Sequence, residues 1–338
     1  MKKAVILFNL GGPDKLESVE PFLFNLFNDP AIISISSIFR YPLAKIISKR
    51  RAPIAKNIYK EIGNKSPILE LTQDQAKSLE NTLAIKGDYK CFVIMRCWHP
   101  RAEDVIKEVK KYNPEEIILL PLYPQFSAST SGSSIKEWND LCKKENYKVK
   151  TKTICCYPTE DSFLESHANL IKKTIKNLEN KDFKLLFSAH GLPENKIKKG
   201  DPYQWQIEQT VEAIMSNLVN ENLDYIISYQ SRVGPLKWIG PSTDEVIIKY
   251  SKEKKGIVIV PVAFVSEHSE TLVELDIEYK KLAEKNGCSF YKRVPALGIE
   301  ENFIEGLTKL ILKKETKGNF VSSVMCPNKY TKCPCLEL

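Results

Sequence analysis

Histidine and carboxylate side chains follow two apolar runs of the sequence at positions that suit catalysis. His190 ends the run KLLFSAH, and the Gly-Leu-Pro turn after it cannot continue a strand. His268 and Glu270 follow a second run, GIVIVPVAF. Parallel α/β sheets bind ligands at the carboxyl ends of their strands, so a histidine there has a positional reason to be functional. A histidine that only hydrogen-bonds a loop backbone is the alternative.

Glu270 also begins a row of acidic residues. The helix that follows the second run is predicted to start at Ser266, whose side chain suits an N-cap. Glu270, Glu274 and Glu278 would share one face of it, where each like-charged pair costs roughly 0.2–0.5 kcal/mol. A solvated acidic face is one interpretation. The other is a path for protons or for a hard divalent cation that leads to His268 and Glu270.

Aromatic and basic residues follow other apolar runs. Trp238 lies in a loop with Gly-Pro steps, which suits stacking on a flat apolar ligand, although tryptophans more often cap a core. Tyr123 precedes the loop QFSASTSGSS, which can offer hydroxyls and backbone donors to carboxylates, although serine-rich linkers look similar. Arg96 follows the run KCFVIM and can pair with a carboxylate through two hydrogen bonds.

The composition indicates a globular protein without a nucleic-acid partner. The 338 residues are 43% apolar and 27% charged, enough for two domains with substantial cores. The net charge of +8 suits an anionic ligand or lipid surface, and the scattered lysine pairs do not indicate nucleic-acid binding. No apolar run is long enough to span a membrane, and MKKAVILFNLGGP lacks a signal-peptide cleavage site. We therefore expect a cytoplasmic protein.

Short apolar runs alternate with amphipathic stretches along the whole chain, which predicts an α/β fold with buried parallel strands. The run FKLLFSAHGLP echoes AVILFNLGGP, which favours two similar doubly wound, Rossmann-like halves. We place the domains at 1–165 and 166–315, followed by a cysteine-rich tail, 316–338. The glycine patterns of dinucleotide and phosphate-binding loops are missing, so we expect no nucleotide cofactor.

The segment 21–53 is unusually apolar and aromatic, and it closes on Lys49, Arg50 and Arg51. Core helices explain part of this pattern. The density of phenylalanine and isoleucine exceeds one buried helix face, so we expect part of the segment, including Phe22, Phe24 and Ile32, to form an exposed lip that touches a membrane or the ligand.

Six motifs, taken in order, resemble the ferrochelatase family: NLGGP, YPQFSASTSGSS, FSAHGLP, YQSRVGP, GPSTDE and FVSEHSETLVELDIEY. The resemblance covers about residues 4 to 315. It implies two Rossmann-like halves around a porphyrin cleft, where ferrous iron enters protoporphyrin IX and two protons leave, in the last step of haem synthesis. It also implies a bacterial-type monomer or homodimer, peripheral to the inner membrane.

The resemblance also assigns roles to residues. His190 matches the family's active-site histidine, and Glu270 matches the carboxylate that faces it across the macrocycle; which of them takes protons and which handles iron stays open. The other residues expected to contact the substrate are Leu10 and Trp238 on the macrocycle, Arg51, Tyr59, Ser66 and Tyr123 at propionate- and pocket-contacting positions, and Arg96, His268 and Glu274 from the arguments above.

Three other activities stay open at this point. A coproporphyrin ferrochelatase or a related cobalt or sirohydrochlorin chelatase would share the architecture. The apolar lip suits protoporphyrin, with its two propionates, better than a substrate with four or more carboxylates. A non-catalytic haem carrier would need axial ligands but no row of glutamates, which argues against it.

The tail holds three of the nine cysteines, Cys326, Cys333 and Cys335. An odd number of cysteines without a signal peptide favours metal ligands over disulfides. The spacing C-x6-C-x-C resembles the tail by which some ferrochelatases hold a [2Fe–2S] cluster. The fourth ligand is missing from the loop 127–134, where Ala128 and Ser134 stand at the candidate positions. Cys142, Cys155 and Cys156 are candidates instead, and reduced thiols or zinc are the alternatives.

Overall fold

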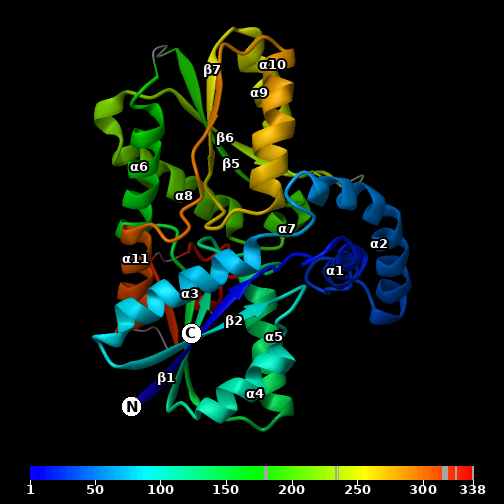
Figure 1. The fold of residues 1–338 in the computed structure, drawn as a ribbon, viewed down its shortest axis with the longest axis vertical. Coiled ribbons are helices and arrows are strands. Elements are labelled where there is room, and N and C mark those ends of the chain that lie inside the picture. Colours follow the sequence, from blue (N-terminus) through cyan, green and yellow to red (C-terminus); the bar gives the residue numbers. More distant parts are fainter. Residues whose placement is uncertain (179–181, 233, 235, 314–318, 324–325, 337–338) are drawn as a thin grey trace. The chain divides into compact units, whose positions relative to one another are not determined.

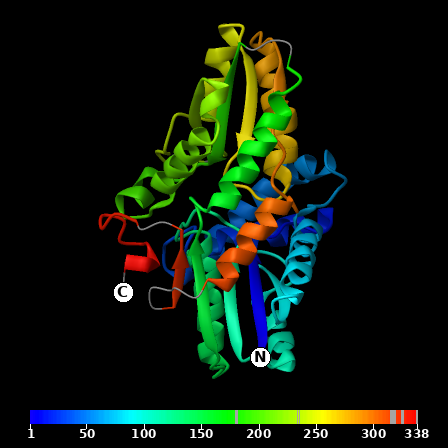
Figure 2. The ribbon, with the colours of Figure 1, turned by 90° about the vertical axis from the view of Figure 1, so that its left-hand side faces the viewer.

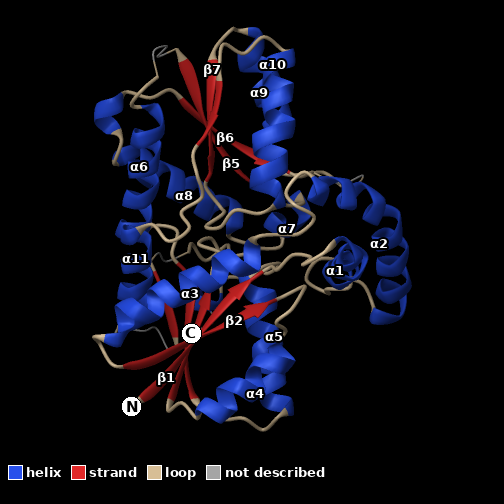
Figure 3. Cartoon of the chain, in the orientation of Figure 1, coloured by secondary structure: helices blue, strands red, loops and turns tan. Residues whose placement is uncertain are grey.

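The computed structural model describes residues 1–178, 182–232, 234, 236–313, 319–323 and 326–336, which fold as two compact units. The first comprises Met1–Cys156 and Leu307–Ser322, and the second comprises Tyr157–Gly306 and Ser323–Glu337. Each unit contains one parallel sheet with helices around it (Figures 1 and 3). The α/β fold predicted from the alternating apolar runs is therefore confirmed.

The sheet of the first unit has the strand order β2-β1-β3-β4-β9 and is parallel throughout. Its strands are β1 (Lys2–Asn9), β2 (Asp88–Met95), β3 (Glu116–Pro121), β4 (Lys150–Cys156) and β9 (Phe320–Ser322). All six residues of β3 are buried, which explains its continuous apolar sequence. The strand β9 comes from the far end of the chain and lies beside β4 (Figure 2).

Helices cover this sheet and extend beyond it. Trp138 of α5 packs with β1, β2, β3 and α4 in one core cluster. The helices of the first unit are α1 (Val19–Phe27), α2 (Ser37–Lys60), α3 (Ile68–Ala84), α4 (Ala102–Tyr112) and α5 (Ser131–Lys144). Among the described residues, no helix combines the length and the apolar character that a membrane crossing requires.

The predicted lip is exposed in part. On α2, the side chains of Ile38, Phe39 and Ile46 are 78%, 68% and 52% exposed. Phe22 of α1 is only 6% exposed and packs in a core cluster with Tyr59, so its assignment to the lip is wrong. The apolar density of this segment reflects two tasks, because α1 buries Phe22 in a core and α2 leaves several of its apolar residues exposed.

The sheet of the second unit has the order β6-β5-β7-β8 and is also parallel. Its strands are β5 (Phe183–His190), β6 (Tyr225–Gln230), β7 (Gly256–Pro261) and β8 (Tyr291–Arg293). Its helices are α6 (Asp161–Ile175), α7 (Glu194–Lys198), α8 (Tyr203–Ser216), α9 (Thr243–Lys252) and α10 (Tyr279–Lys285). The helix α11 (Glu301–Leu312) begins in this unit and ends in the first.

The acidic row lies on a π-helix, η3 (Glu270–Glu278), which continues directly into α10. The helix was predicted to start at Ser266, but that residue lies before it and Ser269 holds the N-cap position. The prediction was wrong because a strand end, a serine and acidic residues fit a start at several positions. π-Helices are rare and are frequently found at functional sites.

Candidate functional site

His190 and Glu270, both in the second unit, contact each other directly. His190 is the last residue of β5, and Glu270 is the first residue of η3, which follows β7. The His190 Nδ1 atom lies 2.9 Å from Glu270 Oε2. The resemblance implies that the two side chains face each other across a macrocycle, whereas in the structure they share a hydrogen bond.

The contact makes the two residues an ion pair. Burial raises the pKa of the Glu270 carboxyl, but the His190 charge and hydrogen bond more than offset this and lower that pKa to about 2. Burial likewise lowers the pKa of His190, and the Glu270 charge reverses this and leaves it above its usual 6.5. The side chains are 40% and 24% exposed, so the pair is open to solvent on one side.

Glu274 lies close to Glu270, but its pKa is shifted in the opposite direction. It accepts hydrogen bonds from the Ser231 backbone at 3.0 Å, the Ser231 hydroxyl at 2.5 Å and the Tyr279 hydroxyl at 3.0 Å. Burial and the nearby Glu270 charge together raise its pKa to about 6. Two neighbouring carboxylates with separated pKa values can divide acid and base roles at neutral pH. Glu274 is therefore suited to take up or release a proton.

Gln230 and Ser231, at the end of β6, donate hydrogen bonds to both carboxylates. Gln230 is opposite His190 in the sheet register, and its Oε1 accepts the Ser188 hydroxyl at 2.6 Å. Its Nε2 consequently faces Glu270 at 3.4 Å and Glu274 at 3.2 Å. Sequence reasoning did not single out Gln230 and Ser231; the signal was their position directly after an apolar run.

A ring nitrogen of His268 lies near the same carboxylate. Its Nδ1 lies 3.1 Å from the Ser266 carbonyl, which identifies Nδ1 as the donor, and its Nε2 lies 4.0 Å from Glu270 Oε1. Burial lowers the pKa of His268, so its imidazole is neutral at neutral pH. A neutral imidazole nitrogen beside a carboxylate is a common ligand set for divalent transition metals.

Trp238 lies close to the histidine. It forms an isolated antiparallel bridge with Pro193, three residues after His190. A Cβ atom on Gly191 would stand 3.2 Å from the Trp238 ring and 2.9 Å from the Gln230 carbonyl. The absence of a side chain at Gly191 thus lets the indole approach the backbone beside His190.

The first unit contains the other predicted contacts. Arg96 donates to Ser133 at 2.8 Å and Glu137 at 2.9 Å and pairs with Asp29 at 3.0 Å, so the predicted carboxylate pairing occurs within the protein. The remaining five are Leu10 at the end of β1, Arg51 and the buried Tyr59 on α2, the buried Ser66 before α3, and the partly buried Tyr123 after β3. Their roles toward a substrate stay predictions.

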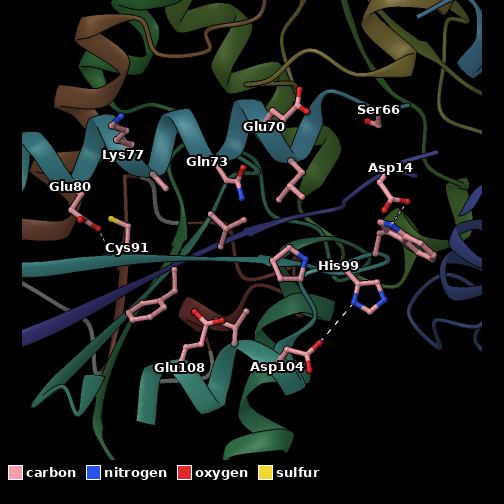
Figure 4. Close-up of a pocket in the computed structure, with 18 of the residues that line it drawn as sticks. Asp14, Ser66, Glu70, Gln73, Lys77, Glu80, Cys91, His99, Asp104 and Glu108 are labelled. Atoms are coloured by element: carbon pink, nitrogen blue, oxygen red, sulfur yellow. Dashed lines mark hydrogen bonds and ion pairs between the residues drawn. The ribbon is translucent and has the colours of Figure 1, made fainter. Parts of the chain in front are cut away.

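The first unit also contains a groove of about 780 Å³ between α3, β2 and α4 (Figure 4). Ser66 lies at one end, and both charged side chains, such as Lys77 and Glu80, and apolar ones, such as Phe92, line the rest. Its pair His99 and Asp104 is 66% and 58% exposed and 3.9 Å apart. This contact is longer and more solvated than that of His190 with Glu270, and exposed pairs of this kind contribute little.

The tail forms a cluster of buried thiols in the second unit. Cys326, Cys333 and Cys335 are at most 4% exposed, and the Sγ atoms of Cys333 and Cys335 lie within 4.8 Å of each other. The Gln206 amide donates to Cys326 Sγ at 3.2 Å. Tyr330 stacks on Trp205 of α8, with 5.6 Å between ring centres. The tail is therefore a folded part of this unit, and its thiols are close enough to bind metal.

Comparison with known proteins identifies a family. The family model described as Ferrochelatase matches residues 2–315. A ferrochelatase from Pelagibacter ubique is 65% identical over 344 residues, covering 100% of this chain and 99% of the relative. A ferrochelatase from Rickettsia felis is 51% identical over 345 residues, covering 99% of each.

Among solved structures, SirB from Bacillus subtilis with Fe³⁺ aligns with a TM-score of 0.52 and 15% identity, over 92% of this chain and 94% of that one. A sirohydrochlorin chelatase SirB in complex with cobalt aligns with a TM-score of 0.50 and 12% identity, over 90% and 92% of the two chains. At this identity the likeness concerns the fold alone.

The ion pair predicts that the coupling free energy between His190 and Glu270, measured in unfolding, depends on pH. Glu270, with its depressed pKa, stabilises the fold fully above pH 4.5 and loses this as the pH falls toward 2. His190, with its raised pKa, contributes fully below pH 6.5 and loses this as the pH rises through the raised value. Urea unfolding of His190→Ala, Glu270→Gln and the double variant should give a coupling free energy that is largest between pH 4.5 and 6.5.

The matched control is the exposed pair of His99 and Asp104, for which His99→Ala and Asp104→Asn should give a coupling near zero at every pH. A coupling between His190 and Glu270 that stays constant from pH 5 to 9 would contradict the ion pair.

Proposed function

The chain belongs to the ferrochelatase family, and we propose that it inserts ferrous iron into protoporphyrin IX at His190 and Glu270. The observation that supports this assignment is the 2.9 Å contact between these two side chains, with the His268 ring nitrogen 4.0 Å from the same carboxylate. The reaction requires a base for two pyrrole protons and ligands that replace water around Fe²⁺, and this group of residues supplies both.

In the proposed sequence, Fe²⁺ binds first to Glu270 and the His268 Nε2 atom. The metal then neutralises the carboxylate that raises the pKa of His190, so His190 loses its proton. Neutral His190 can accept a proton from one pyrrole nitrogen. Glu274, with a pKa of about 6, is the acceptor for the other proton by way of solvent. The metal leaves its protein ligands for the four ring nitrogens, and the two protons go to water.

The alternative activities are not favoured. The relatives named above are ferrochelatases over the full chain, whereas the chelatases that share only the fold are 15% identical or less. A haem carrier needs no proton acceptor, so the raised pKa of Glu274 beside Glu270 favours an enzyme. Protoporphyrin rather than coproporphyrin is the substrate we propose.

The first prediction concerns turnover. His190→Ala and Glu270→Gln should each lower Fe²⁺ insertion into protoporphyrin at least tenfold, about 1.4 kcal/mol or more in the barrier. The control variant His99→Ala, at the exposed histidine, should keep wild-type activity. The assay is anaerobic appearance of haem absorption, with iron, cobalt and zinc compared on protoporphyrin and coproporphyrin. Near-wild-type turnover of either variant would remove that residue from the mechanism, and a preference for coproporphyrin would overturn the substrate.

We also propose that the exposed face of α2 attaches the protein to the surface of the inner membrane from the cytoplasm. Its apolar side chains stand beside the basic residues Lys49, Arg50 and Arg51, a combination that suits anionic lipid. The oligomeric state, monomer or homodimer, stays a prediction.

The second prediction tests this surface. Replacing Ile38, Phe39 and Ile46 together with serine should reduce flotation with phosphatidylglycerol vesicles at least fivefold, without affecting insertion into a water-soluble porphyrin. Ile85→Ser is the matched control, because Ile85 is 82% exposed but lies outside α2. Phe22→Ser should instead cost roughly 3 kcal/mol of stability. Equal flotation of the triple variant and wild type would refute the assignment.

For the tail we propose a [2Fe–2S] cluster with Cys326, Cys333 and Cys335 as three of its ligands. Their burial and the closeness of two Sγ atoms fit such a group. Among the candidates for the fourth ligand, Cys142 packs against the core of the first unit, and Cys156 Sγ lies 3.1 Å from the Ser322 hydroxyl. The fourth ligand stays open among Cys142, Cys155 and Cys156. The cluster would stabilise the tail, and no step of the reaction needs it.

The third prediction tests the cluster. Anaerobically purified protein should show thiolate-to-iron absorption in the visible and about two inorganic sulfides per chain. Cys333→Ser should abolish both, whereas Cys288→Ser, the matched control at a cysteine that donates to the Phe290 carbonyl, should keep them. Colourless, sulfide-free protein with full activity would rule the cluster out.

A further inference from the structure

We propose that Arg293 is a positioning residue for metal delivery: its guanidinium ties the segment before η3 to the middle of that helix and thereby fixes Glu270 and Glu274. The inference rests on the proposed function, because it assigns Arg293 a part in bringing Fe²⁺ to the site. Neither the sequence motifs nor the ion pair with His190 involves this residue.

Arg293 uses three of its donors on two carboxylates of the same segment. Its Nε and Nη2 atoms donate to Asp276 at 2.6 and 2.8 Å, and Nη1 donates to Glu267 at 2.8 Å. The Arg293 side chain is only 11% exposed. Glu267 lies three residues before Glu270 in the sequence, and Asp276 lies within η3. A planar guanidinium with two-point contact fixes direction as well as distance.

The segment that Arg293 contacts carries many like charges, which repel one another. Residues 267–278 contain five acidic residues and no lysine or arginine: Glu267, Glu270, Glu274, Asp276 and Glu278. Like charges at such spacings destabilise a helix. The π form is also intrinsically rare. Contacts from outside the helix must therefore stabilise it, and Arg293 supplies a cation to two of the five acidic groups.

The segment around Arg293 adds two further attachments. The Tyr291 hydroxyl donates to the Leu275 carbonyl of η3 at 2.6 Å, and the Ala296 backbone N–H donates to Glu267 at 2.9 Å. Glu270 and Glu274 are held separately, by the Ser231 hydroxyl directly after β6. The helix is thus fastened by two independent segments, the one around Arg293 and the end of β6.

The consequence should appear in the metal step. If the attachment at Arg293 is lost, η3 no longer holds Glu270 beside the His268 Nε2 atom, so affinity for the metal should fall. Porphyrin binding should change little, because Trp238 and its neighbour Gly191 make no contact with Arg293 among the interactions described above. Selective loss of metal affinity therefore separates positioning from general damage.

The test measures both substrates on the full-length protein. Arg293→Met should raise the KM for Fe²⁺ at least fivefold while the Kd for protoporphyrin, from fluorescence quenching, stays within twofold. Arg293→Lys keeps the charge but not the two-point contact, and it should fall between Arg293→Met and wild type. Lys184→Met is the matched control, because Lys184, near the start of β5, is a buried cation that pairs with Asp224 just before β6. It should lower the melting temperature without raising the KM for Fe²⁺.

A double-variant comparison shows whether Arg293 acts through the acidic row. Co²⁺ affinity, measured by titration calorimetry without porphyrin, should fall at least fivefold in Arg293→Met but less than twofold further when Arg293→Met is added to Glu270→Gln. If the two substitutions instead lower the Co²⁺ affinity by independent factors that multiply in the double variant, the proposal is overturned. If Arg293→Met does not fold, Arg293→Lys and Tyr291→Phe decide, and wild-type KM for Fe²⁺ in both would refute it. Failure of wild type itself to insert iron would refute the proposed function instead.

Discussion

The charge of Glu270 is the constraint on which the site depends. A carboxylate that is about three-quarters buried is costly unless it is paired and hydrogen-bonded. Its partners come from the ends of two adjacent parallel strands, His190 from β5 and Ser231 directly after β6. Because His190 and Gln230 are in register, one carboxylate at the start of η3 reaches both strand ends. The sheet order thus determines where the charge can be stabilised.

The second carboxylate shows how the environment divides chemical roles. Glu270 is held charged by a histidine, whereas Glu274 receives hydroxyl and amide donors but no formal positive charge of its own, and Glu270 repels it. Two residues of the same type, four positions apart, therefore titrate in different pH ranges. This separation allows one to bind a cation while the other exchanges a proton, without any rearrangement of the chain.

The sequence predicted the features that depend on local pattern. Apolar runs such as that of β3 identify strands buried on both faces, and a histidine at the end of such a run, His190, identifies the edge of the sheet where ligands gather. Spacing could not distinguish a π-helix from an α-helix, because four-residue repeats place Glu270 and Glu274 on one face in both. Side chains brought together by tertiary packing were also missed, as the burial of Phe22 and the role of Ser231 show.

Local charge, rather than net charge, decides which ion this site attracts. The chain carries +8 overall, which by itself favours anionic partners. Residues 267–278 nevertheless contain five acidic residues without a lysine or arginine. Charges farther away than about 8–10 Å are largely screened at physiological ionic strength, so a cation near this stretch responds mainly to these acidic groups. The acidic segment of the second unit therefore favours Fe²⁺ through its own charges, although the chain as a whole is positive.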